Sequence, residues 1–391
     1  MKILLAGHIE VSPFWDYLNE ERREYKEWGQ GGTQVSQIGV ELLERDHSVV
    51  VVTLDERANS EIVLKGENLR ICIGPYRPRI RQRMADAFHD ERMYIRKAIA
   101  RESPDIIHAH WTYEYALGAL KSDIPSLITI RDWAPVILFN TPPWPYRLMR
   151  MVMAMYVFWE GRNFTANSLY IYNKTKTWFG WDIPVVPNAL KDRLFYEGER
   201  DPDLCSPKFI AVNNGFGPRK NVRSLLRAFQ IVRRNYPGAQ LHLIGSSYDQ
   251  GEEAHAWARS KNLVENVSFR GKVPHDDVIT AVREADVLVH PAREESFGNT
   301  LVEAMSQKTP VVAGRDSGAV PWVLDNGEAG VLTDVESPQR IAESMLEVTE
   351  SEKKWAHYSE KGYNHAREQF SLAKTVDKFV SIYICVLCSD K

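Results

Sequence analysis

The sequence alternates short, largely apolar runs with segments of helical periodicity, and this alternation constrains the fold more than any other feature. Residues 2–6, 49–53 and 106–110 are such runs, and residues 34–44 and 84–101 between them are predicted to be helices. Short apolar runs bounded in this way are typical of strands buried on both faces. Strands that alternate with helices predict a parallel sheet covered by helices on both faces.

The pattern is interrupted once and then restarts. Residues 191–208 are polar and contain two prolines, and the alternation resumes at residue 209. A chain of 391 residues is long enough for two or three domains. We therefore predict an α/β protein of two doubly wound, Rossmann-like domains that face a central cleft. Their expected limits are 1–185 and 186–369, with a final helix in 370–391 that crosses back onto the first domain.

The most informative stretch of the second half is the segment 290–305, which reads HPAREESFGNTLVEAM. It follows an apolar run and predicts a strand, a loop that carries Glu295 and a helix from about Thr300 that carries Glu303. In an open parallel sheet, ligands bind beyond the carboxyl ends of the strands, where this loop would lie. The backbone N–H groups at the start of the helix favour an anion such as a diphosphate. Gly298 would let the ligand approach the backbone closely.

Each of the two acids also has a simpler interpretation. Thr300-Leu-Val-Glu303 fits a capping box, in which Glu303 would only bind the start of its own helix. Glu295 alone could be a solvated loop carboxylate. The residues alone leave both interpretations open.

Two glycine-bearing loops precede helices and are candidate ligand loops. Gly31-Gly32 lies in the first half, and the loop 213–220, Asn-Asn-Gly-Phe-Gly-Pro-Arg-Lys, lies in the second. In the second loop, Arg219 and Lys220 could bring two positive charges to a phosphate. Neither loop has the GxxxxGK[ST] or GxGxxG pattern, which disfavours nucleoside triphosphates and NAD as ligands.

Polar residues end two of the predicted strands in the first half. His108 and His110 alternate along one strand and should lie on the same face of the sheet, with His110 nearer the loop. Arg131-Asp132 ends the next strand, and Asp132 could be a base or a structural cap. The two histidines could equally be structural. Asp201-Pro-Asp203 resembles a metal-binding DxD, but it lies in the polar linker, so we expect no metal.

Charge and hydropathy narrow the choice of partners and location. The formal net charge of -3 gives no reason to propose nucleic acid. No run reaches 18 uncharged apolar residues, and the first residues read as a strand rather than a signal peptide. We therefore expect a cytoplasmic protein. An Arg-rich segment, 77–83, and an aromatic, Met-rich one, 143–159, fit either a peripheral contact with anionic lipid at the inner face of the membrane or helices packed on the sheet.

The segment from Glu295 to Glu303 resembles the E-x7-E signature of the retaining glycosyltransferases of family 4, which have the GT-B fold. Other segments agree with the family in their order along the chain. These are Gly31-Gly32, Pro104–His110, Pro187-Asn188, Phe269–Val273 and the stretch from Pro310 to Gly330.

The resemblance implies a role for each matching residue. Glu295 would bind hydroxyls of the donor sugar, Glu303 the ribose hydroxyls, and Lys220 would neutralise the departing diphosphate. The implied catalytic residues are Glu295, Lys220 and His110. The implied donor-binding residues are Gly31, Gly32, Asn214, Arg219, Lys220, Val273, Glu295, Phe297, Gly298, Asn299, Thr300 and Glu303. Arg131 and Asp132 are the acceptor-side candidates, and neither a metal nor a cofactor is implied.

The chain departs from the family pattern at three positions. Gly215 stands where the family usually has Arg, Arg131 where it often has His, and Trp322 where it often has Glu. Arg219 or Asn214 would then substitute for the missing Arg.

These observations predict a retaining, metal-independent glycosyltransferase that moves a sugar from a nucleotide donor, a UDP-sugar, to a glycan or lipid-linked acceptor. The process would be the biosynthesis of cell-envelope polysaccharide or another glycoconjugate. Two alternatives stay open: a GT-B epimerase or hydrolase of nucleotide sugars, and a non-catalytic nucleotide-sugar-binding subunit.

Overall fold

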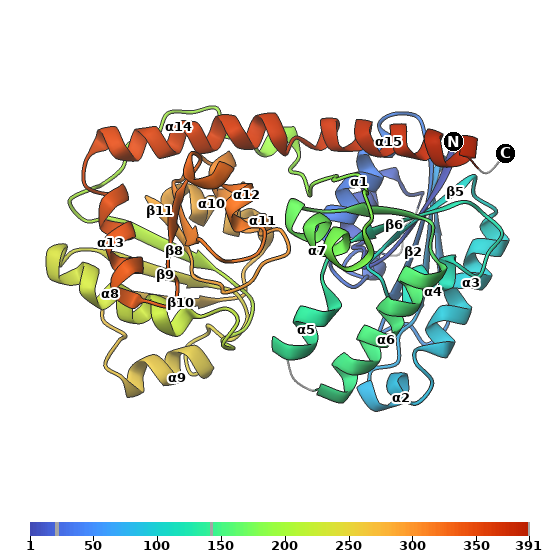
Figure 1. Ribbon diagram of the computed structural model, residues 1–391, viewed down its shortest axis with the longest axis horizontal. Helices are drawn as coiled ribbons and strands as arrows, with labels where there is room; N and C mark the ends of the chain where they lie inside the picture. The colour runs from blue at the N-terminus through green and yellow to red at the C-terminus, as the bar shows by residue number, and fades with distance from the viewer. Residues whose placement is uncertain (20–22, 141–143, 390–391) are drawn as a thin grey trace. The chain divides into compact units, whose positions relative to one another are not determined.

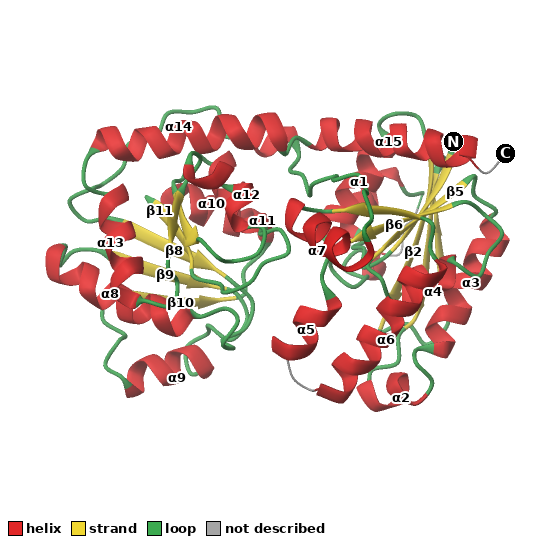
Figure 2. Cartoon of the chain, viewed as in Figure 1, coloured by secondary structure: helices red, strands yellow, loops and turns green. Residues whose placement is uncertain are grey.

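The computed structural model describes residues 1–19, 23–140 and 144–389, and the chain divides into two compact units. The first unit comprises Met1–Asn188 and Leu372–Lys391, and the second comprises Ala189–Ser371 (Figure 1). Each unit is built around its own sheet, with helices packed against it (Figure 2). The predicted α/β class is confirmed.

The described residues of the first unit form a seven-stranded sheet of order β3-β4-β2-β1-β5-β6-β7. Its strands are β1 (Lys2–Ala6), β2 (Ser48–Asp55), β3 (Ile62–Lys65), β4 (Leu69–Pro75), β5 (Ile106–His110), β6 (Ser126–Ile130) and β7 (Asn163–Ala166). The pairing is parallel except between β3 and β4, which are antiparallel. The expectation of a wholly parallel sheet was wrong here, because the short connection between β3 and β4 allows only a hairpin.

The helices of the first unit include one from the far end of the chain. They are α1 (Thr33–Leu43), α2 (Ile80–Ala85), α3 (His89–Glu102), α4 (Glu114–Ala119), α5 (Ala134–Asn140), α6 (Trp144–Glu160), α7 (Leu169–Phe179) and α15 (Leu372–Ser389). Helix α15 packs on α1, where Arg45 donates to the side chain of Asp377 at 2.5 Å and to the carbonyl of Ala373 at 2.9 Å. None of the helices that the structure describes combines the length and apolar character needed to cross a bilayer.

The second unit contains a six-stranded sheet of order β10-β9-β8-β11-β12-β13, with parallel pairing throughout. Its strands are β8 (Lys208–Val212), β9 (Gln240–Ile244), β10 (Val267–Gly271), β11 (Val287–His290), β12 (Val311–Gly314) and β13 (Val331–Thr333). Its helices are α8 (Val222–Asn235), α9 (Glu253–Ser260), α10 (His275–Glu284), α11 (Asn299–Ser306), α12 (Val320–Val323), α13 (Pro338–Val348) and α14 (Glu352–Gln369).

The strand order locates the candidate site of each unit. In the first unit β1 lies between β2 and β5, and in the second β8 lies between β9 and β11. On one side of β1 and of β8 the chain adds strands in one direction, and on the other side it adds them in the opposite direction. The loops that follow neighbouring strands at this place therefore turn to opposite sides of the sheet. Such a switch point leaves a crevice at the carboxyl ends of the strands, where ligands bind in open α/β sheets.

Candidate functional site

In the second unit, the loops that follow β8 and β11 meet at the switch point. Lys220 lies in the first loop and Glu295 in the second, and Lys220 Nζ is 2.5 Å from Glu295 Oε1. Arg219 is held beside them, because its Nη1 donates to the carbonyl of Glu294 at 3.0 Å and its own carbonyl accepts from Arg293 N at 2.8 Å. The predicted cationic loop and the predicted acid therefore lie together.

Glu295 is a carboxylate with several cationic or donor neighbours. Its Oε1 also lies 3.2 Å from Nε2 of His290, the last residue of β11, and 3.6 Å from Nη1 of Arg219. Burial by itself would raise the pKa of Glu295, but Lys220, His290 and Arg219 outweigh it and hold the pKa well below its usual range. Glu295 is therefore ionised near neutral pH, so it accepts hydrogen bonds and cannot serve as a general acid.

Helix α11 begins at Asn299, four residues after this acid, in the segment that follows β11. Its N-cap is Gly298, whose φ of 94° is a left-handed conformation that favours glycine. The N-cap makes no side-chain hydrogen bond to the helix start. The N-terminal end of α11, where the positive end of the helix dipole lies, is therefore a candidate position for an anion.

Glu303 does not close a capping box, so that alternative was wrong. The helix starts one residue earlier than predicted, at Asn299, and Thr300 lies inside its first turn rather than at the N-cap. The Oε1 atom of Glu303 instead lies 3.0 Å from Nε2 of His275, at the start of α10. Glu303 is held in place across two helices, with 8% of its surface exposed.

In the first unit, the Gly31-Gly32 loop lies against the residues that follow β1. A Cβ at Gly32 would come within 1.9 Å of the carbonyl oxygen of His8, so only glycine fits there. The ring of His8 packs against Trp111, with centroids 4.8 Å apart. Asp55, at the end of β2, accepts from Gly29 N at 2.7 Å and so fixes the approach to this loop.

His108 and His110 lie on one face of the sheet, as predicted, with ring centroids 4.0 Å apart. His108 is structural: its Nδ1 lies 2.6 Å from Tyr383 Oη of α15 and its Nε2 2.7 Å from Thr129 Oγ1. His110 is fully buried, and its Nδ1 accepts from Nε of Arg131 at 3.0 Å. His110 and Arg131 are thus brought together.

Asp132, the other acceptor-side candidate, has a different hydrogen-bond partner. Its Oδ1 accepts a hydrogen bond from Tyr113 Oη at 3.0 Å. Burial raises the pKa of Asp132 to about 6, although Arg150 and Tyr113 pull it down. A carboxyl with this pKa exchanges protons near neutral pH, which keeps the prediction of a base open.

Comparison with known proteins finds a matching family model for each half of the chain. Residues 31–192 match the family model described as Glycosyltransferase Family 4, and residues 204–365 match the one described as Glycosyl transferases group 1. The chain belongs to the family 4 glycosyltransferases of the GT-B type.

Relatives of the glycosyltransferase resemble it over most of its length. N-acetyl-alpha-D-glucosaminyl L-malate synthase of Bacillus anthracis is 24% identical over 94% of this chain and 97% of its own. D-inositol 3-phosphate glycosyltransferase of Segniliparus rotundus is 25% identical over 75% and 69%. Among solved structures, sucrose-phosphate synthase of Thermosynechococcus elongatus has a TM-score of 0.80 at 18% identity, with both chains covered completely. That likeness confirms the GT-B fold.

Three further residues that were predicted to bind the donor of the glycosyltransferase are Phe297, Asn214 and Val273, and each has different surroundings. Phe297 is 3% exposed and packs on Trp322 and Phe370, with centroids 6.0 and 5.5 Å away. It can therefore offer a ligand only its backbone. The side chain of Asn214 accepts from Ser246 N at 3.2 Å, and Val273 is half-buried before the start of α10.

Three polar residues of the second unit were missed by the sequence analysis. His290 and His275 hold the two predicted acids, and neither pairing follows from sequence spacing. Asn213, at the end of β8, is 4% exposed, and its side-chain amide has no hydrogen-bond partner among the described residues. Its place as the first residue of the predicted loop 213–220 was the available signal.

The expected basic, aromatic surface of the first unit is only partly present. Arg77 is engaged by Asp86, Asp90 and Glu91, and Arg150 pairs with Glu114, so both are internal ion pairs. The exposed residues of this region that suit a lipid surface include Arg79, Arg81, Phe139, Trp144 and Trp159. Pro143, also in the predicted segment, lies outside the described residues.

Proposed function

We propose that the protein transfers a sugar from a UDP-sugar to an acceptor hydroxyl, with retention of the anomeric configuration and without a metal. The observation that carries the proposal is the pairing of Lys220 with Glu295 beside the N-terminus of α11. It puts a cation beside the N-terminal end of a helix, a combination that favours a diphosphate, next to a carboxylate able to accept from sugar hydroxyls.

The reaction breaks the bond between the anomeric carbon and the diphosphate oxygen and forms a bond from that carbon to the acceptor oxygen. Negative charge grows on the leaving diphosphate, and Lys220, Arg219 and the α11 N–H groups are placed to stabilise it. In our proposal, attack occurs on the face that the diphosphate leaves, and a phosphate oxygen takes the acceptor proton. Glu295 then acts by orienting the sugar, which agrees with its depressed pKa.

Helix α11 also supports the proposed nucleotide site. Glu303 is fixed by His275 at the far side of the first helical turn and can accept from ribose hydroxyls. A solved relative in fold, HepE of Anabaena, was crystallised with UDP and glucose; it has a TM-score of 0.70 and 18% identity over 98% of this chain and 99% of its own. That similarity motivates UDP as the first nucleotide to test.

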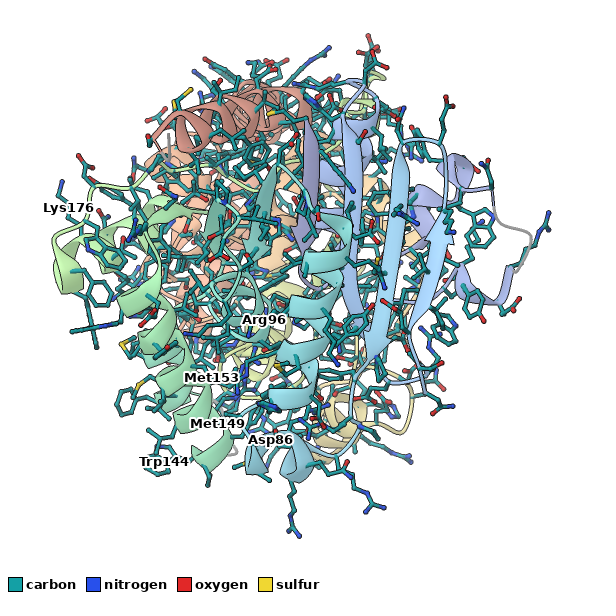
Figure 3. The ribbon with its side chains drawn as sticks, turned by 90° about the vertical axis from the view of Figure 1, so that its right-hand side faces the viewer. Asp86, Arg96, Trp144, Met149, Met153 and Lys176 are labelled. Atoms are coloured by element: carbon teal, nitrogen blue, oxygen red, sulfur yellow. The ribbon has the colours of Figure 1, made fainter. Side chains whose placement is uncertain are left out.

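We propose that the acceptor is a glycan or lipid-linked molecule used in making cell-envelope polysaccharide or another glycoconjugate. We also propose that the exposed face around α5 and α6 binds anionic lipid. Figure 3 looks onto this side of the first unit, where Trp144, Met149 and Met153 follow one another along α6. Phe139 and Trp159 are 80% and 85% exposed, and Arg79 and Arg81 on the neighbouring α2 segment supply positive charge. Aromatic side chains beside arginines suit a headgroup surface.

The test is a screen of UDP-, GDP- and ADP-sugars for protection against thermal unfolding, followed by product analysis. A bound nucleotide at about a hundred times its Kd stabilises its unit by roughly 2.7 kcal/mol. We expect UDP-sugars to protect the wild type and not Glu303→Ala, and transfer to survive a chelator. Retention would be read from the anomeric NMR coupling of the product. Absence of protection by every nucleotide would refute the donor site, and a protected protein that never transfers sugar would favour the non-catalytic alternative.

A further inference from the structure

Arg131 is a buried cation that no carboxylate neutralises among the residues that the structure describes. Its Nε donates to His110 Nδ1 at 3.0 Å, and its Nη1 donates to Asn188 Oδ1 at 2.6 Å. The guanidinium also lies over the ring of Trp111, 5.6 Å from the centroid. All three neighbours are uncharged: the pKa of His110 lies well below its ordinary value because of burial, His108 and the positive charge of Arg131 itself.

Arg83, the other buried arginine in the described part of the first unit, has an acidic partner, and so do the half-buried Arg150 and Arg77. Arg150 pairs with the buried carboxylate of Glu114, and Arg77 pairs with three acids. Arg83, with 7% of its side chain exposed, reaches Glu56 at 3.4 Å. An unpaired buried charge is unfavourable, so proteins normally pair it or use it. Arg131 is the exception within the described part of this unit, and 8% of its surface remains exposed.

A second donor beside Arg131 also lacks a partner. Because Nδ1 of the neutral His110 ring accepts from Arg131, the ring proton lies on Nε2. That Nε2 atom is buried and has no hydrogen-bond partner among the described residues. Thus a cation and an unsatisfied N–H group lie at the carboxyl ends of β5 and β6, next to the switch point at β1.

The backbone holds this arrangement in place. Trp111, which stacks on Arg131, has a φ of 65°, a left-handed conformation that is costly for a residue with a bulky side chain. Such strain persists only where the surroundings fix it, and here Trp111 N donates to the carbonyl of Thr129 at 3.1 Å. The stacked ring shields one face of the guanidinium from water, which strengthens its attraction for an anion.

We propose that Arg131 and His110, with Asn188 positioning the guanidinium, form a site for an oxyanion, a carboxylate or phosphate group carried by one of the substrates. The site lies entirely within the first unit. The assignment of the oxyanion to a substrate rests on the proposed function, whereas the binding of an oxyanion at this site does not depend on it. Two sources share this chemistry: an acidic group on the acceptor, and an acidic group on the donor sugar.

The first experiment is isothermal titration calorimetry of the full chain with inorganic phosphate, L-malate and D-glucuronate, each against a neutral probe such as D-glucose or glucuronamide. We expect at least one oxyanion to bind, the neutral probes not to bind, and the affinity to fall as salt is added. Arg131→Met should weaken binding about 30-fold or more, because the buried partner charge is lost. Arg131→Lys should retain part of it. Arg96→Met, which removes an exposed arginine of α3, is the matched control and should bind as the wild type does.

Stability distinguishes this site from a structural role. If Arg131 only supported the fold, Arg131→Met would lower the Tm of the free protein. We expect the Tm to stay constant or rise, because an unneutralised buried charge has been removed. If Arg131→Met does not fold, Arg131→Lys and His110→Ala provide the same comparison of affinities. Wild-type protein that binds no oxyanion, or an Arg131 variant with unchanged affinity, would overturn the proposal.

The source of the oxyanion is then found with substrates. If UDP-glucuronate binds more tightly than UDP-glucose and Arg131→Met removes the difference, the donor carries the oxyanion. If the two donors bind equally and malate adds to either, the acceptor carries it. Failure of the donor proposal stays distinguishable: Glu303→Ala should lose UDP binding and keep oxyanion binding, whereas Arg131→Met should keep UDP binding and lose oxyanion binding.

Discussion

Lys220 and Glu295 are 75 residues apart in the sequence, yet Nζ and Oε1 lie 2.5 Å apart across the crevice between β8 and β11. The ion pair keeps each residue in position before any ligand arrives. A diphosphate that binds near Lys220 competes with Glu295 for its charge, which would release Glu295 to accept from sugar hydroxyls. The pair is therefore expected to matter more for transfer than for folding.

Exchanging either member should mainly reduce the rate of transfer. Lys220→Met removes the cation that stabilises the leaving group, so we expect kcat to fall about 100-fold to 1,000-fold. The kcat of Glu295→Gln should fall by a similar factor, because the donor sugar is no longer oriented. Steady-state kinetics with a UDP-sugar measures both. Lys354→Met, which removes an exposed ion pair in the same unit, should transfer sugar normally. Variants with unchanged kcat would remove both residues from the mechanism.

Glu303 and His275 should act together on nucleotide binding. Glu303→Ala is expected to weaken UDP binding by about 1.5 to 3 kcal/mol, because hydrogen bonds to a charged acceptor are lost. His275→Ala should have a smaller effect, since it only orients Glu303. Calorimetric titration with UDP and with uracil separates ribose contacts from base contacts. If uracil binding falls equally, Glu303 acts through the fold rather than through the ribose.

Asp132 should give the first unit a pH dependence with a defined sign. Burial raises its folded pKa to about 6, above the usual 3.8 of an aspartate. The protonated form is thus favoured by folding, and its contribution is present below about pH 4 and is lost as the pH rises through about 6. A shift of about two units corresponds to roughly 3 kcal/mol. Relative to Asp132→Asn, the wild type should lose stability between pH 4 and 6, as measured by urea unfolding; parallel curves would contradict this.

Trp322 should be structural. It occupies the position where the family often has Glu, and here its ring packs on Phe297 and Phe370. Trp322→Glu would place a carboxylate in this aromatic cluster and should destabilise the second unit by about 2 to 4 kcal/mol. The measurement is thermal unfolding, and Trp322→Phe, which keeps an aromatic ring, should lose less. A variant that is equally stable and more active would instead give position 322 a role in catalysis.

Membrane contact should depend on the exposed aromatics of α5 and α6. Phe139→Ser with Trp159→Ser should reduce sedimentation with vesicles that contain anionic lipid, because both rings are largely exposed. Ile384→Ser, which removes an exposed apolar residue of α15, is the control. If the double variant binds these vesicles as well as the wild type does, the proposed lipid surface would be contradicted. The same holds if the wild type binds neutral vesicles as well as anionic ones.

Sequence alone placed most elements because their signals are local. The apolar run before Glu295 and the Gly298 that starts α11 are contiguous, and the predicted strand and helix are found within a residue or two. The break between α2 and α3 was missed, because Ala87 and Phe88 adopt positive φ without a Gly or Pro to signal it. The predicted helix over 84–101 is therefore present from His89 onward, as α3, and its predicted start was wrong.

The candidate site could be predicted only in part. The acids and Lys220 are visible as a motif, but their partners His290 and His275 depend on tertiary packing. The same holds for Arg77, whose hydrogen-bonded acids Asp86 and Glu91 lie 9 and 14 residues further on and neutralise its charge within the unit. Arg131 was visible as a departure from the family, whereas its lack of a counter-charge required the structure.

The first unit is interrupted in the sequence by the whole of the second, since α15 returns to it after residue 371. On the ribosome, the second unit therefore emerges complete before the first can close. Until α15 arrives, His108 lacks the Tyr383 hydroxyl that lies 2.6 Å from its Nδ1, and the α1 surface lacks its covering helix. The order of synthesis thus delays assembly of the first unit until translation of α15 is finished, so the first unit is the part that would need a chaperone in the meantime.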